Sequence, residues 1–145
     1  MIKAIGNVTI VVQDGKNVST QQVSNLVVDS GLNLMRDRIA GLSSAYATHF
    51  ALGASASAVT SAQTTLVDEK VRDVLTSAVG SPSKSVVFNY YLPAGIGNGN
   101  TLREIGLFTQ SSGGIMVARA LLATPIVKTA LVTATFAWTI TFAAV

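Results

Sequence analysis

Hydrophobic and polar positions alternate most regularly between Thr129 and Phe142. This stretch contains no charged residue, glycine or proline. Its apolar alternate positions are Val132, Ala134, Phe136, Trp138, Ile140 and Phe142. The positions between them are mostly threonine, and a period of two carried by aromatic and β-branched side chains is typical of a half-buried strand. We therefore expect a long strand that buries its apolar face and turns its threonine face to water or to another subunit.

A membrane-spanning helix is the alternative interpretation of this region. The uncharged run continues to Val145, which gives about 17 residues, near the lower limit for a helix that crosses a bilayer. In a helix the threonines would point in all directions, whereas in a strand they share one face. The strict alternation favours the strand, and we expect no association with a membrane.

The N-terminal part of the chain predicts a hairpin followed by a helix. Residues 2–13 are apolar and β-branched, Asp14-Gly15 is a strong signal for a two-residue hairpin turn, and residues 16–28 read as the returning strand. A helical spacing of three and four residues then recurs at Leu32, Met35, Ile39 and Leu42. We expect one short amphipathic helix near residues 30–42, with these side chains packed against a sheet.

Short apolar or alternating segments separated by turn residues fill the rest of the chain. The expected strands are 48–53, 71–79, 85–92, 101–109 and 114–122. We expect residues 66–70 to form a helical turn, and Pro125 to end the pairing of the last two strands. About eight strands with short turns and one helix predict a mainly β protein, with residues 1–145 forming a single domain of β-sandwich or jelly-roll-like type.

The chain has few charged residues for its length. They make up 12% of the 145 residues, about half of the usual quarter. Because a monomer of this size normally shows more charge to water, we expect neighbouring subunits to cover much of its surface. The net charge of +3 is spread along the chain without a basic cluster, so we expect no binding to nucleic acid.

Residue types that carry chemistry are scarce. Without cysteine there is no disulfide, thiolate nucleophile or sulfur-ligated metal, and the N-terminus lacks the apolar core of a secretion signal, which predicts assembly in a cytoplasm. We interpret His49, the only histidine, as structural, and the glycines of residues 95–99 as a loop without the phosphate-binding pattern. Glu69 and Glu104 each lie near an arginine, an arrangement that holds folds more often than it catalyses. We therefore expect no enzyme, catalytic residue, cofactor, metal or small-molecule substrate.

Several short motifs resemble a known family. Leu66–Arg72 is similar to the L-x-x-E-x-x-R motif of bacteriophage tail-collar and fibre-base domains, which follows an A-L-G strand such as Ala51–Gly53. Arg103–Phe108 reads R-E-I-G-L-F and resembles their R-E-x-G-L-F motif. Met116–Arg119 and Pro125–Thr129 resemble the a-x-a-r and P-x-x-K segments that come next in these domains. The resemblance covers roughly residues 25–142 and keeps the order of the motifs.

The resemblance implies a non-enzymatic structural protein of a tailed-phage virion, assembled in the bacterial host. We expect a homo-oligomer, a dimer or trimer, that docks on other virion proteins of the tail, collar or fibre base. A host-recognition fibre would continue into a long shaft, whereas this sequence ends at Val145, so a capsid decoration (cement) protein is an open alternative. A further alternative is a module that binds host-surface glycans through Tyr90, Tyr91 and the loop 95–100.

Seven residues are assigned structural or interface roles. They are Glu69, Arg72, Arg103, Glu104, Gly106, Phe108 and Trp138. We predict that an arginine, with Arg72 as first choice, holds Glu104 and so fixes neighbouring strands or subunits. Gly106 is expected to let another backbone or a ring approach closely. Phe108 and Trp138 are expected in the core, with an interface as the alternative.

Overall fold

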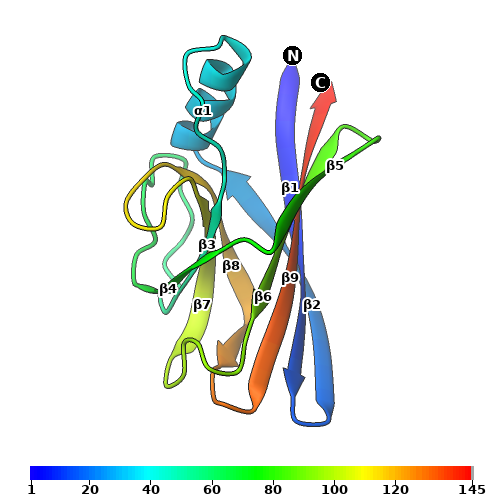
Figure 1. Cartoon of the computed structure of the whole chain (residues 1–145), viewed down its shortest axis with the longest axis vertical. Helices are drawn as coiled ribbons and strands as arrows, with labels where there is room; N and C mark the ends of the chain where they lie inside the picture. Colours follow the sequence, from blue (N-terminus) through cyan, green and yellow to red (C-terminus); the bar gives the residue numbers. More distant parts are fainter. Residues whose placement is uncertain (145) are drawn as a thin grey trace.

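The computed structural model describes residues 1–144 and consists of one antiparallel sheet of nine strands with one short helix (Figure 1). The strands are β1 (Ile2–Asp14), β2 (Asn17–Val27), β3 (His49–Gly53), β4 (Glu69–Val74), β5 (Ser77–Ser81), β6 (Ser85–Leu92), β7 (Thr101–Phe108), β8 (Met116–Val127) and β9 (Val132–Ala144). The helix is α1 (Asp29–Ile39). Across the sheet the order is β4-β3-β7-β8-β2-β1-β9-β6-β5. The expected mainly β class with one short helix is confirmed.

The sheet curls so that its two halves pack face to face, as the layers of a sandwich do. One half is β4-β3-β7-β8 and the other is β2-β1-β9-β6-β5. Phe50 of the first half lies between rings of the second: its centroid is 4.7 Å from Tyr90, 4.8 Å from Phe136 and 5.9 Å from Trp138. The buried side chains that lie between the two halves form one contiguous core around this aromatic cluster.

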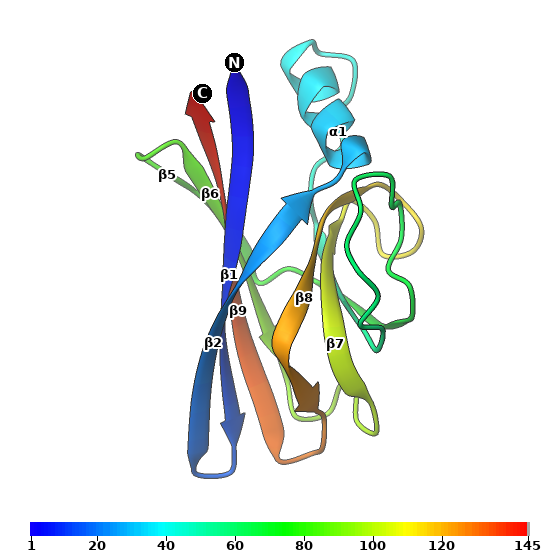
Figure 2. The same cartoon turned by 180° about the vertical axis from the view of Figure 1, so that it is seen from behind.

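The halves are joined through a short seam between β2 and β8. Only Asn25–Val27 of β2 pairs with β8, opposite Ala118–Ala120. Beyond this seam the two strands diverge toward the end of the molecule that carries the β1–β2 turn (Figure 2). β1 is instead paired along its whole length with β9, from Ile2 opposite Ala144 to Asp14 opposite Val132.

The strongest sequence patterns are confirmed. Along β9 the apolar positions Val132, Ala134, Phe136, Trp138 and Ile140 are at most 3% exposed, while the threonines between them face outward. The β1–β2 hairpin turns at Gly15, whose φ of 60° is a left-handed conformation that glycine adopts without strain. The alternation of the side chains and the turn residue are local properties, so the sequence alone is sufficient to reveal them.

The expected helical turn at residues 66–70 and the single strand 71–79 are wrong. β4 already begins at Glu69, and the strand is interrupted at Leu75 and Thr76. At this interruption the chain crosses from one half of the sheet to the other. The Leu75 N–H donates to the Thr48 carbonyl oxygen beside β3, and the Thr76 N–H donates to the Asn89 carbonyl oxygen in β6.

Pro125 does not end β8, which continues to Val127. The register with β7 shifts there, because Leu102 faces Ile126 while Glu104 faces Leu121, so residues 122–125 form a bulge. A bulge tolerates proline, which has no N–H to give to a ladder. Gln21 of β2 holds this bulge: its Oε1 accepts from the N–H groups of residues 123 and 124, and its Nε2 donates to the carbonyl oxygen of residue 124.

The helix packs on a different side from the one its spacing predicts. Gly31 and Leu34 are buried, whereas Ile39 is 89% and Leu42 is 76% exposed. α1 is fixed by its first turn, where Gly31 lies too close to the Val117 backbone for any Cβ atom. The rest of α1 extends beyond the sheet (Figure 1), which leaves part of its apolar side in water. In residues 1–144 no helix has both the length and the apolar character needed to cross a membrane.

Candidate functional site

Three motifs of the sequence meet in space on the outer side of β3, β7 and β8, namely Leu66–Arg72, Arg103–Phe108 and Met116–Arg119. The connection between β3 and β4, residues 54–68, folds over this side and inserts Leu66 into a second small core. This core also contains Val28, Ala51, Phe108 and Met116. The outer side of the first half-sheet is therefore covered by the protein's own chain.

Glu104 and Arg119 form an ion pair at the centre of this region. Both side chains are 0% exposed, and Arg119 donates to Glu104 Oε2 from Nε at 2.9 Å and from Nη2 at 2.7 Å. The Asp68 N–H donates to Glu104 Oε1 at 2.7 Å, and the Val67 N–H donates to Oε2 at 3.1 Å. Arg119 Nη1 donates to the Ser57 carbonyl oxygen at 3.0 Å. The pair thus ties both ends of the β3–β4 connection to the sheet.

An arginine holds Glu104, as predicted, but the first choice, Arg72, is wrong. Arg72 lies on the edge strand β4 and donates to Glu69 Oε1 at 2.7 Å. Its guanidinium carbon lies 3.6 Å from the centre of the Phe108 ring, a cation–π contact. Because β3 separates β4 from β7, Arg72 is one strand too far from Glu104, whereas Arg119 is on the neighbouring strand β8.

The remaining motif residues have structural positions. A Cβ atom at Gly106 would lie 2.9 Å from the Phe108 ring and 3.0 Å from Leu66, so the predicted close approach of a ring at Gly106 is confirmed. Arg103 Nη1 donates to the Ala54 carbonyl oxygen at 3.3 Å. Phe108 and Trp138 are 1% and 0% exposed. Trp138 belongs to the main core between the half-sheets, apart from the other motif residues.

Two buried cations were absent from the predicted set. Arg119 follows Met116, Val117 and Ala118 in an apolar strand, and a charge inside such a run needs a buried partner, which is a signal the sequence does contain. The other is Lys128, which is 1% exposed. Its position between Val127 and Thr129 gives no comparable signal.

The glycine-rich loop before β7 encloses Lys128. Lys128 Nζ donates to Asn98 Oδ1 at 2.7 Å, to the Thr129 carbonyl oxygen at 2.9 Å and to the Ala94 carbonyl oxygen at 3.0 Å. Burial lowers the pKa of this ammonium group. The oxygens of the loop are directed at a cation, which is the opposite of the N–H cradle that binds phosphate.

Two side chains considered for catalysis, Glu104 and His49, are engaged in other contacts. Glu104 is sealed from solvent, and His49 Nδ1 shares a 2.7 Å hydrogen bond with the hydroxyl of Thr48. In the described part of the chain, residues 1–144, no three His, Asp or Glu side chains are grouped to hold a metal ion. Tyr90, one of the two tyrosines considered for glycan binding, is 2% exposed and donates to Asp73 Oδ2 at 2.9 Å.

Because of the buried Tyr90 hydroxyl, we predict that the free energy of unfolding decreases at alkaline pH. Burial, and then the hydrogen bond to Asp73, raises its pKa, so the folded protein keeps this proton when the unfolded chain has released it. The stability that Tyr90 provides is therefore complete below about pH 10 and falls above it by up to about 1.4 kcal/mol per pH unit. Urea denaturation between about pH 9 and 11 is expected to show a steeper decline for the wild type than for Tyr90→Phe. Equal slopes would contradict this assignment.

The second half-sheet contains fewer charged residues than the first, and the connection of residues 54–68 covers only the first. Its five strands contain Lys3 and Asp14, near the two ends of β1, as their only charged residues within the described bounds. We call the side of β2-β1-β9-β6-β5 that points away from the core the outer face. Its central positions are Asn7, Thr9, Val11, Val87, Asn89, Tyr91, Thr135, Ala137 and Thr139. In contrast, β4 alone carries Glu69, Lys70, Arg72 and Asp73.

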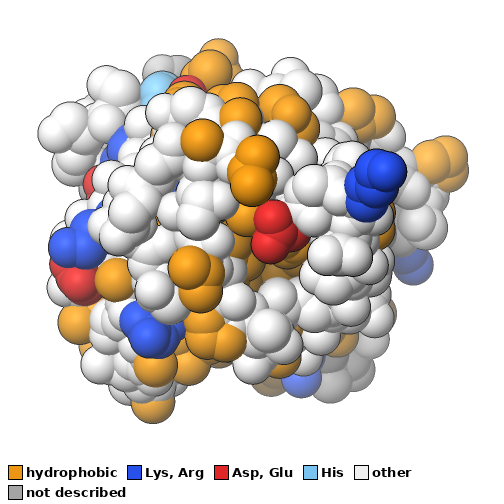
Figure 3. Space-filling model, turned by 90° about the horizontal axis from the view of Figure 1, so that it is seen from below, with side chains coloured by type: hydrophobic (Ala, Val, Ile, Leu, Met, Phe, Trp, Pro, Cys, Tyr) orange, Lys and Arg blue, Asp and Glu red, His pale blue; other side chains and the backbone are white. Residues whose placement is uncertain are grey.

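Three hollows add to this weakly charged surface. A hollow of about 260 Å³ lies among Thr9, Val11, Asn89 and Thr135 on the outer face. A larger and almost wholly apolar one, about 570 Å³, lies beside α1, and its lining includes Met35, Ile39, Tyr46, Phe88 and Phe142. The third, about 330 Å³, lies between the diverging ends of β2 and β8. Figure 3 views the molecule from this end and shows hydrophobic side chains at the surface with few charged ones between them.

Comparisons with protein-family models, curated proteins and solved structures found no match for this chain.

Proposed function

We propose that this chain is a non-enzymatic structural protein of a tailed-phage virion that self-associates and docks in the tail, collar or fibre-base region. The outer face is the observation that carries this proposal. Five strands lie side by side there with charge only near the ends of β1. Solvent-exposed sheets usually carry charged side chains that prevent association, so an uncharged face of this extent is suited to contact with another protein.

The size of the outer face fits a stable protein interface. Five strands at a spacing of about 4.8 Å, each contributing about eight residues at 3.4 Å, give a flat area of about 650 Å². A standard interface buries about 800 Å² on each partner. The threonine and asparagine side chains of β9, β1 and β6 provide hydrogen bonds across such a contact, and the apolar side chains between them provide burial.

The convergence of the motifs supports the phage resemblance. Leu66, Arg72, Glu104, Gly106 and Phe108 come from two short motifs of the kind found in tail-collar and fibre-base domains. They form one packed region, in which Leu66 covers Gly106 and Arg72 covers Phe108. Motifs that cooperate in space are better support for a shared architecture than the same motifs scattered over the surface.

The number of copies in purified phage particles tests the proposal and its alternative. We expect quantitative mass spectrometry to find from a handful to a few dozen copies per particle, as for components of the tail, collar or fibre base. Hundreds of copies would overturn this placement in favour of the cement protein on the capsid, for which the uncharged outer face is equally suited. Absence from the particle would overturn both.

A glycan-binding function has weaker support. Tyr90 points into the core, so only Tyr91 of the two tyrosines is open to a sugar. The loop 95–100 is engaged in holding Lys128. We expect NMR titration with bacterial cell-wall oligosaccharides to leave the Tyr91 resonances unchanged, and a saturable shift there would favour the glycan-binding module.

A further inference from the structure

The two terminal strands of the sheet differ in how they are protected against pairing with other chains. β4, at one end, has four charged residues among its six. β5, at the other end, reads Ser-Ala-Val-Gly-Ser and has none. Charged side chains, proline and bulges are the usual means by which proteins prevent the addition of a strand to an open edge. Within its five residues β5 has none of these.

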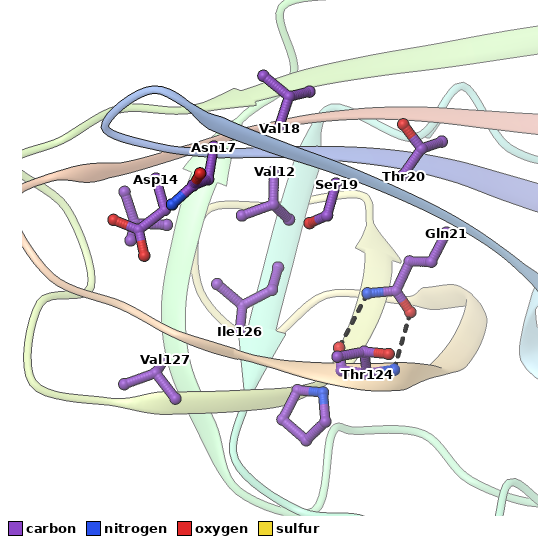
Figure 4. A pocket seen from close by; sticks show the side chains of 12 residues that line it. Val12, Asp14, Asn17, Val18, Ser19, Thr20, Gln21, Thr124, Ile126 and Val127 are labelled. Carbon is purple, nitrogen blue, oxygen red and sulfur yellow. Dashed lines mark hydrogen bonds between the residues drawn. The ribbon is translucent and has the colours of Figure 1, made fainter.

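A third open edge lies within the sheet, on β2. Because β2 pairs with β8 only at Asn25–Val27, its residues closer to the hairpin turn have no strand on that side. The side chain of Gln21 bridges the two strands by a hydrogen bond to Thr124. Between Gln21 and Asn17 of β2, the gap that separates β2 from β8 contains the 330 Å³ hollow (Figure 4). Residues 17–21 carry no charge. In an antiparallel ladder alternate residues direct their N–H and C=O groups away from the partner, so this segment offers unpaired backbone groups.

β5 and the open segment of β2 match in length and direction. Both are five residues long, 77–81 and 17–21. Four successive antiparallel pairings connect β5, β6, β9, β1 and β2, so β5 and β2 run in the same direction. Two copies in the same orientation can therefore place β5 of one beside β2 of the other as a parallel pair.

The side chains of β5 also suit a narrow gap. Ala78 and Gly80 are opposite Phe88 and Val86, so they lie on the core side of the sheet, where the hollow is lined by Val12, Ile126 and Val132. Both are small enough to approach these side chains. A Cβ atom at Gly80 would meet nothing within 4 Å, so the chain itself does not require a glycine there.

We propose that β5 of one copy adds to residues 17–21 of β2 in the next, so that the uncharged half-sheet continues from subunit to subunit. The inference rests on the proposed self-association and specifies its geometry. Val79 then pairs with Val18 or Thr20, since the pleat keeps side chains of one face together. The contact is heterologous, joining different surfaces of two copies, and so adds copies in one direction.

Charge substitutions at the two edges test the pairing. Val18 and Val79 are 63% and 55% exposed, so lysine at either position leaves the fold intact. We expect each single change, Val18→Lys or Val79→Lys, and the double change Val18→Lys/Val79→Lys to weaken association by at least about tenfold in sedimentation velocity. Val18→Lys/Val79→Glu places opposite charges side by side and is expected to restore it. Val74→Lys, at a 61% exposed valine of the charged terminal strand β4, is the matched control and should associate like the wild type.

Gly80→Val gives an independent test by shape. It is expected to melt like the wild type, because the added side chain meets no atom of its own chain, and to abolish association, because it fills the gap that β5 must occupy. A wild type that stays monomeric up to its solubility limit overturns the inference, as do oligomers insensitive to Val18→Lys and Gly80→Val. In the latter case the copy number per particle still decides the proposed virion role separately. Loss of association with Val79→Lys but not with Val18→Lys would also overturn it, in favour of β5 pairing with β5.

Discussion

Replacing Arg119 by methionine is expected to lower the free energy of unfolding by about 3 kcal/mol, because it leaves the buried carboxyl group of Glu104 without its cationic partner. Methionine fills much of the same apolar space, so the loss is electrostatic rather than a cavity effect. For a chain of this length the melting temperature should fall by about 10 °C in calorimetry. Hydrogen exchange at the amides of Val67 and Asp68, which donate to Glu104, should accelerate at the same time.

Two further variants make the Arg119 result specific. Arg36→Met removes one half of an exposed ion pair with Asp37 and is expected to change stability by less than about 0.5 kcal/mol. Glu104→Gln keeps the shape of the side chain and one carbonyl acceptor, so its loss should lie between those of the other two variants. If Arg119→Met and Glu104→Gln both melted like the wild type, the ion pair would not be what holds the β3–β4 connection.

Truncation of Phe50 to alanine is expected to cost about 4 kcal/mol, the range found when a buried aromatic ring leaves a cavity. Phe50 is the ring of the first half-sheet that contacts Tyr90, Phe136 and Trp138 of the second. Its loss should reduce near-ultraviolet circular dichroism as well as the midpoint of urea unfolding. Tyr91→Ala, on the outer face, is the control, with an expected loss below about 1 kcal/mol. Similar losses for the two variants would refute the central role of Phe50.

Much of the fold was predictable because its strongest signals are local. The alternation of β9 and the Asp14-Gly15 turn each depend on residues that are neighbours in sequence. The face of α1 was not predictable in this way, since the close contact of Gly31 with Val117 determines it and this contact joins distant parts of the chain. Pro125 was misread for the same reason: whether proline ends a strand depends on the bulge opposite β7 and on Gln21.

The candidate interface was predictable only in part. The low charge and the threonine face of β9 are visible in the sequence. That five uncharged strands lie side by side, and that β5 and part of β2 are open edges, follows from the strand order. The prediction that Arg72 holds Glu104 was wrong for the same reason, because the sequence does not show that β8, which carries Arg119, is the strand beside β7.

The level of β5 relative to β2 determines the pitch of an assembly built from this chain. Through the ladder Val79 is level with Val87, Thr139, Asn7 and finally Ser24. If Val79 pairs with Val18 or Thr20 of the next copy, each subunit is displaced along the strands by four to six residues, about 13–20 Å. This displacement corresponds to the shear of a β-barrel, which requires the strands to tilt from the barrel axis. A closed ring of subunits can therefore form only if the strands are tilted from the ring axis. If the strands are parallel to that axis, the subunits form an open helical filament.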